Sequence, residues 1–298
     1  MLKLDEKKIR KGRPIGLPYQ GSKKKISKKI IEIIKQNFGT DKPIYDIFGG
    51  GGAITAECIL NGLEVHYNDL DKDITNAFER VISQDRDWIK TLIVSRDEFF
   101  EIKDKENKTT DDFLKLLINS FGNKKIDYLY SKEISDLKYN LAKEIIEKHD
   151  VFRGYKQAET YKRSIEKYKQ LQRLQQLERL QQLQQLQRLE QLERLERLNE
   201  AKATNKSYHT FSDVSGAILY LDPPYEGSHQ KGYINQFDSQ EFYDWAFEIA
   251  KNNIVIISSY SISDERFEVV YSFDKAHSTL QSGTRNDKCE KLFMVKNS

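Results

Sequence analysis

Short apolar runs of strand length alternate along the chain with longer stretches of helical periodicity. Buried strands are expected at 44–48, 63–67, 217–221 and 253–258, with further strands at 267–273 and 291–295. Helices are expected at 22–37, 53–60 and 73–81, and another begins at Asp238 with apolar residues at i, i+3, i+4 and i+7. This alternation predicts an α/β fold.

The apolar run at 217–221 ends at Asp222-Pro223-Pro224-Tyr225. Proline lacks an N–H and fixes φ, so the chain must leave the sheet at Asp222. The resulting stiff turn places a carboxylate, carbonyl groups and an aromatic ring at the carboxyl end of a strand, where open α/β sheets bind ligands. Such a set suits a planar group with an exocyclic amine, but a capping Asp and a packed Tyr in an ordinary turn would explain it equally.

A glycine turn follows the first predicted strand, and an acid follows the second. Phe48 leads into four glycines at 49–52, just before a predicted helix, and this arrangement lets a ligand approach the backbone closely. The spacing does not fit the dinucleotide fingerprint G-x-G-x-x-G. Asp69 lies about twenty residues after Asp46, a position that suits a pair of ribose hydroxyls. A helix cap is the competing interpretation, and Asp71 fits that role better.

Leucine recurs at every third residue from Leu171 to Leu198, with Gln, Arg and Glu between. These residues are strong helix formers, so the leucine array is expected to be helical. Three residues advance about 300° around an α-helix, so the leucines circle the helix instead of forming one stripe. A heptad coiled coil and a leucine-rich-repeat solenoid are therefore poor fits. We expect a helical insertion outside the catalytic core. Self-association through part of it is the less favoured alternative.

Composition narrows the class of protein. Charged residues make up 32% of the 298 residues, so the surface is very polar, and no apolar stretch approaches the roughly 18–20 residues that span a membrane. The first residues lack the apolar region of a secretory signal. Cys58 and Cys289 form neither a disulfide framework nor a metal-ligand pattern. We therefore expect a cytoplasmic protein that needs no metal and no membrane.

Cationic residues concentrate in two places that suit nucleic acid. Residues 1–35 contain twelve Lys or Arg and three acids, which suits phosphate contacts, although a solvated tail explains residues 1–13 equally well. The segment 119–125 combines amides, an aromatic ring and two lysines, which suit base edges and phosphates but also an ordinary loop. The candidates for such contacts are Asn119, Phe121, Asn123, Lys124 and Lys125.

Four stretches, in this order, resemble the Dam-like adenine-specific DNA methyltransferases, a family that includes phage enzymes. They are 18–23 with its tyrosine and lysine, 46–52 with its glycine turn, Asp69, and 222–225. The resemblance covers roughly residues 14–165 and 201–296. The leucine array departs from the family's pattern, so nothing is carried over to it.

The resemblance implies a Rossmann-like fold that uses S-adenosylmethionine and acts on double-stranded DNA in a bacterial or phage-infected cell. We expect a cofactor-binding part at 14–83, a mainly helical target-recognition subdomain at 84–165, the leucine/glutamine-rich insertion at 166–200 and a catalytic part at 201–298. The implied catalytic residues are Asp222, Pro223, Pro224 and Tyr225. The implied cofactor-binding residues are Tyr19, Lys23, Asp46, Phe48, Gly50, Gly52, Asp69 and Asp222.

The implied reaction is methyl transfer to adenine N6 after base flipping. The Asp222 carboxylate and the Pro223 carbonyl would hold the amine and favour a tetrahedral nitrogen facing the methyl donor. Tyr225 would stack on the flipped base, so Tyr225→Phe should be mild and Tyr225→Ala severe. The alternatives are another acceptor, such as cytosine N4, an RNA base or a protein amide, and an inactive DNA-binding or self-associating protein of the same fold.

Overall fold

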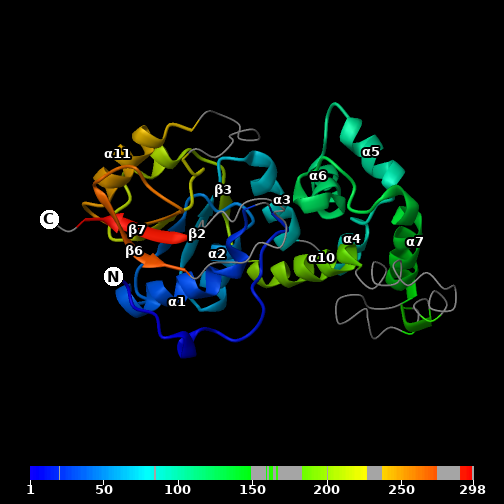
Figure 1. The fold of residues 1–298 in the computed structure, drawn as a ribbon, viewed down its shortest axis with the longest axis horizontal. Coiled ribbons are helices and arrows are strands. Elements are labelled where there is room, and N and C mark those ends of the chain that lie inside the picture. Colours follow the sequence, from blue (N-terminus) through cyan, green and yellow to red (C-terminus); the bar gives the residue numbers. More distant parts are fainter. Residues whose placement is uncertain are drawn as a thin grey trace. The chain divides into compact units, whose positions relative to one another are not determined.

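The computed structural model covers the whole chain and describes most of it in detail. The described residues are 1–19, 21–83, 85–148, 159, 161–163, 166, 183–199, 201–226, 237–273 and 289–296. They form two compact units (Figure 1). The sheet unit comprises Met1–Pro14, Lys23–Thr75 and Ala201–Ser298, and the helical unit comprises Ile15–Ser22 and Asn76–Glu200. Each unit is thus built from segments that are distant in sequence.

A seven-stranded sheet in the order β3-β2-β1-β4-β5-β7-β6 forms the centre of the sheet unit. Its strands are β1 (Ile44–Asp46), β2 (Val65–Asn68), β3 (Ala203–Thr204), β4 (Ile218–Leu221), β5 (Ile254–Ser259), β6 (Phe267–Ser272) and β7 (Lys291–Val295). The first five strands are parallel, and β7 runs antiparallel to both β5 and β6. The predicted α/β fold of Rossmann type is confirmed. Strand order reverses between β1 and β4, which is the place where open α/β sheets bind ligands.

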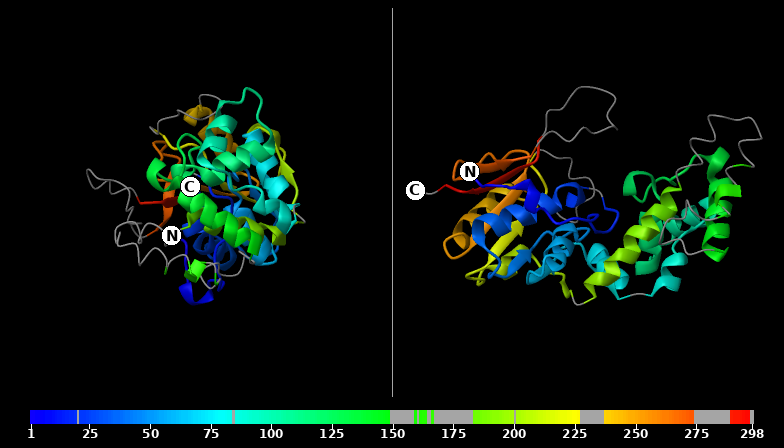
Figure 2. Two further views of the ribbon diagram at one scale, coloured as in Figure 1. Left: turned by 90° about the vertical axis from the view of Figure 1, so that its right-hand side faces the viewer. Right: turned by 90° about the horizontal axis from the view of Figure 1, so that it is seen from below.

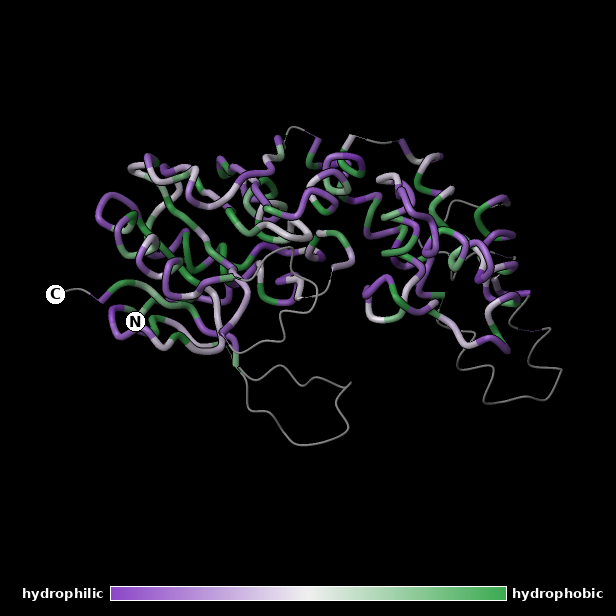
Figure 3. Tube along the Cα trace, turned by 90° about the horizontal axis from the view of Figure 1, so that it is seen from above, coloured by the Kyte–Doolittle hydropathy of each residue, from purple (hydrophilic) through white to green (hydrophobic). Residues whose placement is uncertain are grey.

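Helices cover both faces of this sheet, so β4 is buried on both sides. Side chains alternate between the faces of a strand: Ile218 packs in the cluster that contains the isoleucines of α1 (Ser27–Phe38), and Leu219 packs against α11 (Ser239–Ile249). Figure 1 shows α1 and α11 on opposite sides of the sheet. Figure 3 shows hydrophobic and hydrophilic positions alternating along the chain in both units.

Local signals account for most of the element boundaries. Asp238 caps α11 as expected, because its Oδ1 accepts hydrogen bonds from the backbone N–H groups of Gln240 and Glu241 at 2.9 and 3.0 Å. The helix α2 (Ala53–Leu60) has the expected bounds. The helix expected from residue 22 instead begins as the 3-10 helix η2 (Lys23–Lys25), followed by α1. Three consecutive lysines are disfavoured in the first turn of an α-helix, where the helix dipole is positive.

The N-terminal arm, residues 1–13, packs on the rest of the sheet unit and is not a solvated tail. The Leu2 N–H donates to the Val270 carbonyl at 2.8 Å. Arg10 forms a two-pronged ion pair with the buried Glu57, with Nε–Oε1 and Nη2–Oε2 distances of 2.7 and 2.9 Å. Such bidentate pairs are among the stronger charged contacts. The charge of Arg10 is thus paired with Glu57. Fewer cations of the arm are available to bind phosphate groups than its composition indicates. A further 3-10 helix, η1 (Glu6–Lys8), lies within this arm.

The helical unit contains a bundle of short helices, shown from two further directions in Figure 2. Its elements are α4 (Arg86–Lys90), α5 (Arg96–Asp104), α6 (Thr110–Asn119), η3 (Phe121–Asn123), α7 (Lys132–Lys148), α10 (Gln184–Glu193) and η6 (Arg194–Leu198), while α3 (Lys72–Ile82) begins in the sheet unit. Both the segment expected to recognise the target and the segment expected to be an insertion belong to this unit. The remaining short elements, β3 and η7 (Tyr208–Phe211), belong to the sheet unit.

The described part of the leucine array is a core element of the helical unit. Its six leucines are all completely buried, at positions 183, 186, 189, 192, 195 and 198. Leu183 precedes α10 as its N-cap, the next three leucines spread over about a third of the circumference of α10, and this helix contacts both α4 and α6. The last two belong to η6, whose three residues per turn match the period of the array. Each buried leucine contributes roughly 1.5–3 kcal/mol. The leucines from 171 to 180 lie outside the described residues.

Candidate active site

The glycine turn after β1 has a backbone that only glycine adopts readily. Gly50 and Gly52 have φ values of 48° and 69°, in the left-handed region. A Cβ at Gly49 would collide with the ring of Tyr67 on the neighbouring strand. The Gly50 N–H donates to Oδ2 of Asp69 at 2.7 Å, and the Tyr67 hydroxyl donates to the Gly50 carbonyl at 2.8 Å. The turn and the acid after β2 therefore form one unit at the carboxyl edge of the sheet.

Two further predicted cofactor residues support this turn. Oδ2 of Asp46 accepts hydrogen bonds from the backbone N–H and the hydroxyl of Thr55, at 3.1 and 2.7 Å, which ties β1 to α2. Phe48 packs among aromatic rings on the α11 side of the sheet, with Phe242 at a centroid distance of 5.6 Å. Both residues shape the turn. Direct contact between either side chain and a cofactor stays a prediction.

Burial controls the charge of the two acids at this edge. It raises the pKa of Asp46 to about 7, although the hydrogen bonds from Thr55 oppose the change. It raises the pKa of Asp69 to about 6 against the hydrogen bonds from the N–H groups of Asp71 and Gly50. Asp69 is thus ionised at neutral pH and can accept further hydrogen bonds through its carboxylate.

A cluster of charged and hydroxyl side chains surrounds Asp222 at the carboxyl end of β4. Nζ of Lys23 lies 2.7 Å from Oδ1 of Asp222 and donates to the Tyr225 hydroxyl at 2.6 Å. That hydroxyl donates to Oε1 of Glu290 at 2.6 Å, and the Ser258 hydroxyl donates to the same oxygen at 2.7 Å. Lys23 also lies 3.8 Å from Oε1 of Glu290. One cation therefore holds two carboxylates and the tyrosine of the Asp-Pro-Pro-Tyr turn together.

Glu290 is a site residue that sequence reasoning missed. It directly precedes β7, which runs antiparallel to β5 with Ser259 opposite Lys291. The amino end of β7 therefore lies at the carboxyl end of β5, on the same edge as Asp222. The sequence does show an acid immediately before an expected strand. Placing that acid at the site requires knowing that the strand is antiparallel to β5.

The charges in the cluster are coupled. Burial raises the pKa of Asp222, while the ion pair with Lys23 opposes the rise. Burial alone would lower the pKa of Lys23, but the charges of Asp222 and Glu290 outweigh it, so this pKa is raised. Lys23 therefore stays protonated, and its charge favours the ionised form of Asp222 against the effect of burial.

Tyr225 is oriented by its ring as well as by its hydroxyl. Its ring meets Tyr260 edge to face at a centroid distance of 4.7 Å, and Tyr260 is 37% exposed. Pro223 is buried and Pro224 is half-buried, so the turn itself is packed. The remaining residue of the predicted cofactor set, Tyr19, belongs to the helical unit, and its role stays a prediction.

The predicted DNA-contacting segment divides into buried and exposed residues. Asn119 is completely buried, and its Nδ2 donates to the carbonyls of Leu92 and Lys115 at 2.8 and 2.7 Å. This corrects the expectation for Asn119, because a buried amide bonded to the backbone serves packing and cannot reach a base edge.

The next residues form a surface turn. Phe121 is 57% exposed and Lys124 is exposed, so both remain candidates for DNA contact. Asn123 and Lys125 adopt positive φ values of 59° and 62°. Nζ of Lys125 lies over the ring of Phe113 at 4.0 Å from its centroid. Among the five candidates, Phe121 and Lys124 therefore present the most accessible side chains.

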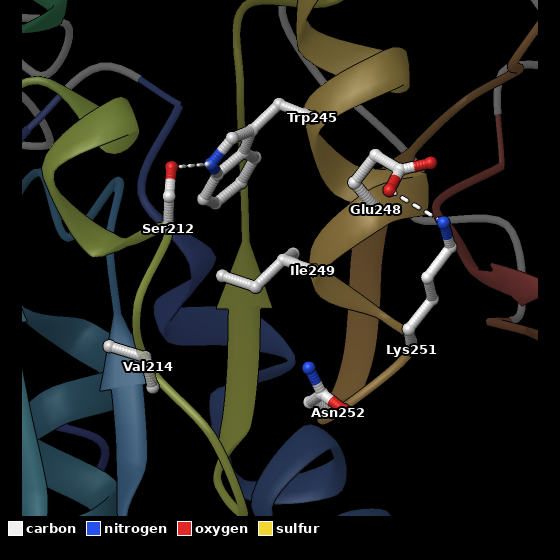
Figure 4. A pocket seen from close by; sticks show the side chains of 7 residues that line it. All are labelled: Ser212, Val214, Trp245, Glu248, Ile249, Lys251 and Asn252. Atoms are coloured by element: carbon white, nitrogen blue, oxygen red, sulfur yellow. Dashed lines mark hydrogen bonds and ion pairs between the residues drawn. The ribbon is translucent and has the colours of Figure 1, made fainter.

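A pocket of about 260 Å³ lies away from these residues (Figure 4). It is lined by Ser212, Val214, Trp245, Glu248, Ile249, Lys251 and Asn252. The Trp245 indole N–H donates to the Ser212 hydroxyl at 3.0 Å. Ser212 and Val214 precede β4, and the other five belong to the second half of α11 or to the link from α11 to β5, so the pocket lies at the amino ends of these strands. This pocket thus lies at the opposite edge of the sheet from Asp222.

Within the described part of the chain, no cluster of three His, Cys, Asp or Glu side chains is arranged to hold a metal ion. None of the helices described there combines the length and the apolar character needed to cross a membrane.

Comparison with known proteins assigns the chain to a family. A model of the D12 class N6 adenine-specific DNA methyltransferases matches residues 19–282, a range that contains Lys23, Asp69 and Asp222. No curated protein matches the chain. Enzymes of this family generally use S-adenosylmethionine as the methyl donor. The match spans most of the chain, and the sheet carries the expected acids at its carboxyl edge. The chain therefore belongs to the D12 class N6 adenine-specific DNA methyltransferases.

Proposed function

We propose that this enzyme methylates adenine N6 at specific sites in double-stranded DNA, with Asp222 holding the amine that accepts the methyl group. The observation that carries the proposal is the position of Asp222. It ends β4 beside the reversal of strand order, and Lys23 bonds its Oδ1 at 2.7 Å. A carboxylate bonded on one oxygen by a half-buried cation has its second oxygen in a defined direction.

The residues at the carboxyl edge fit S-adenosylmethionine. The glycine turn offers close backbone approach at the start of α2, and Asp69 offers carboxylate oxygens for the ribose hydroxyls. When bound, this cofactor would supply an electrophilic methyl group on a sulfonium. A methyl donor held by this turn would lie near Asp222, because β1 and β4 are neighbours in the sheet.

Asp222 and Pro223 would prepare the amine. The lone pair of an adenine amine is delocalised into the ring, which makes the nitrogen a weak nucleophile. Two acceptors, Oδ2 of Asp222 and the Pro223 carbonyl, would bond its two N–H groups and favour a tetrahedral nitrogen. Most of the acceleration would come from alignment and electrostatics, with no covalent intermediate. The proton leaves after transfer, so Asp222 need not be a full general base.

The adenine must leave the duplex, which costs a few kcal/mol. Stacking on the Tyr225 ring would return roughly 1–3 kcal/mol. The hydrogen bonds of the Tyr225 hydroxyl with Lys23 and Glu290 support this role, because they fix the plane on which the base would stack.

These contacts change the expected effect of Tyr225→Phe. A hydrogen bond between a neutral and a charged group contributes about 1.5–3 kcal/mol. We expect Tyr225→Phe to lower kcat/KM by about tenfold, which is more than a purely stacking ring would give, and Tyr225→Ala to lower it by a further tenfold or more. Tyr271→Phe, a tyrosine on β6, is the matched control. Steady-state methylation kinetics would measure all three, and equal losses for Phe and Ala would remove the stacking role.

The pKa of Asp69, raised by burial to about 6, predicts a pH dependence of cofactor affinity. Only the carboxylate accepts both ribose hydrogen bonds, so affinity is present above this pKa and lost as the pH falls through it. We expect the Kd for S-adenosylmethionine to rise between pH 7 and pH 5, and Asp69→Asn to weaken binding and flatten the profile. Calorimetric titration would test this. A profile that Asp69→Asn leaves unchanged would assign the titration to another group.

The test of the function itself is incorporation of labelled methyl groups into DNA. After incubation with labelled S-adenosylmethionine, nucleoside analysis should place the label in N6-methyladenine, and genome mapping should show a short sequence common to the modified adenines. Label in cytosine or in RNA would show that the enzyme acts on a different acceptor from adenine in DNA. Saturable cofactor binding without any methyl transfer would favour an inactive protein of the same fold.

A further inference from the structure

Two polar side chains of the leucine array contact a loop between α6 and α7. The family resemblance covers this loop but does not extend to the array. The loop, residues 120–128, is termed the recognition loop because it carries Phe121 and Lys124. Gln185 and Arg188 lie one turn apart on α10 and bond residues at or beside both ends of the recognition loop. All of these residues belong to the helical unit.

Gln185 joins the two ends of the loop. It is completely buried, and its Nε2 donates to Oδ1 of Asn119 and to the Tyr128 hydroxyl, the latter at 3.1 Å. The Tyr128 hydroxyl in turn donates to the Val94 carbonyl at 2.9 Å. Asn119 directly precedes the loop and Tyr128 ends it. A buried polar network of this kind favours one conformation of the loop. A buried atom that loses its hydrogen-bond partner cannot bond water instead, and this costs free energy.

Arg188 caps the helix that leads into the loop. Its Nη1 donates to the carbonyls of Ser120 at 3.0 Å, Leu117 at 3.5 Å and Ile118. The last carbonyls of α6 have no partner within the helix, and the helix dipole favours a cation at this end. Burial lowers the pKa of Arg188 to about 10, so the guanidinium stays charged at neutral pH.

The recognition loop needs such support because its backbone is strained. Gly122, Asn123 and Lys125 adopt φ values of 63°, 59° and 62°, and only the glycine tolerates this region easily. Strained residues persist where the surrounding contacts determine the conformation. At the base of the loop, Ser120 pairs with Tyr128 as an antiparallel bridge.

We propose that Gln185 and Arg188 are positioning residues for DNA recognition, which hold the recognition loop in the conformation that presents Phe121 and Lys124 to DNA. This rests on the proposed function, since it assumes that the loop contacts DNA. The array is then a working part of target recognition, although its sequence reads as a simple repeat.

Point variants test the role. Gln185→Leu and Arg188→Met keep the length or volume of the side chain but remove its hydrogen bonds, and Gln184→Leu on the same helix is the matched control. We expect each test variant to raise the KM for DNA by about tenfold, while kcat and the Kd for S-adenosylmethionine change less than twofold. Proportional losses in kcat and cofactor binding would overturn the proposal, because they would show general damage.

A second readout needs no DNA. Trypsin cleaves after lysine, so Lys124 and Lys125 report the order of the recognition loop in the free protein. Cleavage there should accelerate about tenfold in both test variants but not in the control, with cleavage after Lys105 as the internal reference. Unchanged cleavage would overturn the inference even if the protein methylates DNA. Absence of methylation by the wild-type protein would overturn the proposed function, while the cleavage rates would still report the support of the loop.

The repeat itself offers a third test. Deleting residues 180–188 keeps leucine at every third position and brings Gln176 and Arg179 into the places of Gln185 and Arg188. Deleting residues 183–188 also keeps the leucine phase but puts arginine first and glutamine second. We expect a KM for DNA within about threefold of wild type for the nine-residue deletion and a rise of about tenfold for the six-residue deletion. The same KM in both deletions would contradict the role of this pair.

Discussion

Asp222→Ala is expected to lower kcat for methyl transfer by about a thousandfold, while the Kd values for S-adenosylmethionine and DNA change only a few-fold. The size follows from the loss of a preorganised polar group at the reacting atom, which typically costs 10²–10³ in rate. Single-turnover methylation of a DNA that contains a mapped site would measure the chemical step, and titration would measure both affinities.

The matched control for this variant is Asp213→Ala, because Asp213 is an exposed aspartate shortly before β4. It should leave the rate unchanged. Near wild-type turnover in Asp222→Ala would contradict the assignment of Asp222 as the residue that holds the amine.

Lys23→Met is expected to lower activity at neutral pH by about a hundredfold and to make the remaining activity rise with pH. Lys23 is the cation between Asp222 and Glu290, and without it the two half-buried carboxylates would repel each other. The pKa of Asp222, already raised by burial, would rise further. An acid with a raised pKa is ionised only above that value, so the active carboxylate would return as the pH increases. A pH series of kcat between 6 and 9.5 would show this.

Two further variants make the test of Lys23 more specific. Lys25→Met removes an exposed lysine of the same 3-10 helix and should have no effect. Adding Glu290→Gln to Lys23→Met should restore part of the neutral-pH activity, because the second carboxylate no longer repels the first. A loss that is the same at every pH and that Glu290→Gln does not relieve would show that Lys23 acts in another way.

The parts of the site that the sequence predicted depend on local chemistry. Two prolines after an apolar run determine where β4 stops, so the position of Asp222 follows from covalent geometry. Four glycines after a short strand predict a turn in the same way. The ends of neighbouring parallel strands meet at one edge, and this rule brings Asp69 to the glycine turn without knowledge of the full topology.

The parts that the sequence did not predict depend on tertiary direction and burial. Glu290 reaches the site only because β7 is antiparallel, which an apolar run does not reveal. Asn119 and Phe121 have the composition of a polar loop, yet one is fully buried and the other is largely exposed. The period of the leucine array does not show that its described leucines are all buried, since burial depends on neighbours elsewhere in the chain.

The pairing of β1 with β4 has a consequence for the order of events during synthesis. Ile44 pairs with Ile218, whereas most of the helical unit is the continuous segment Asn76–Glu200 between them. At about 5–20 residues per second, roughly 10–35 seconds pass between the emergence of these two strands. The helical unit can fold during that time, while β1 and β2 wait with an open edge for β4. The helical unit can therefore form first, and the candidate active site around Asp222 forms last, when the final segment joins the sheet.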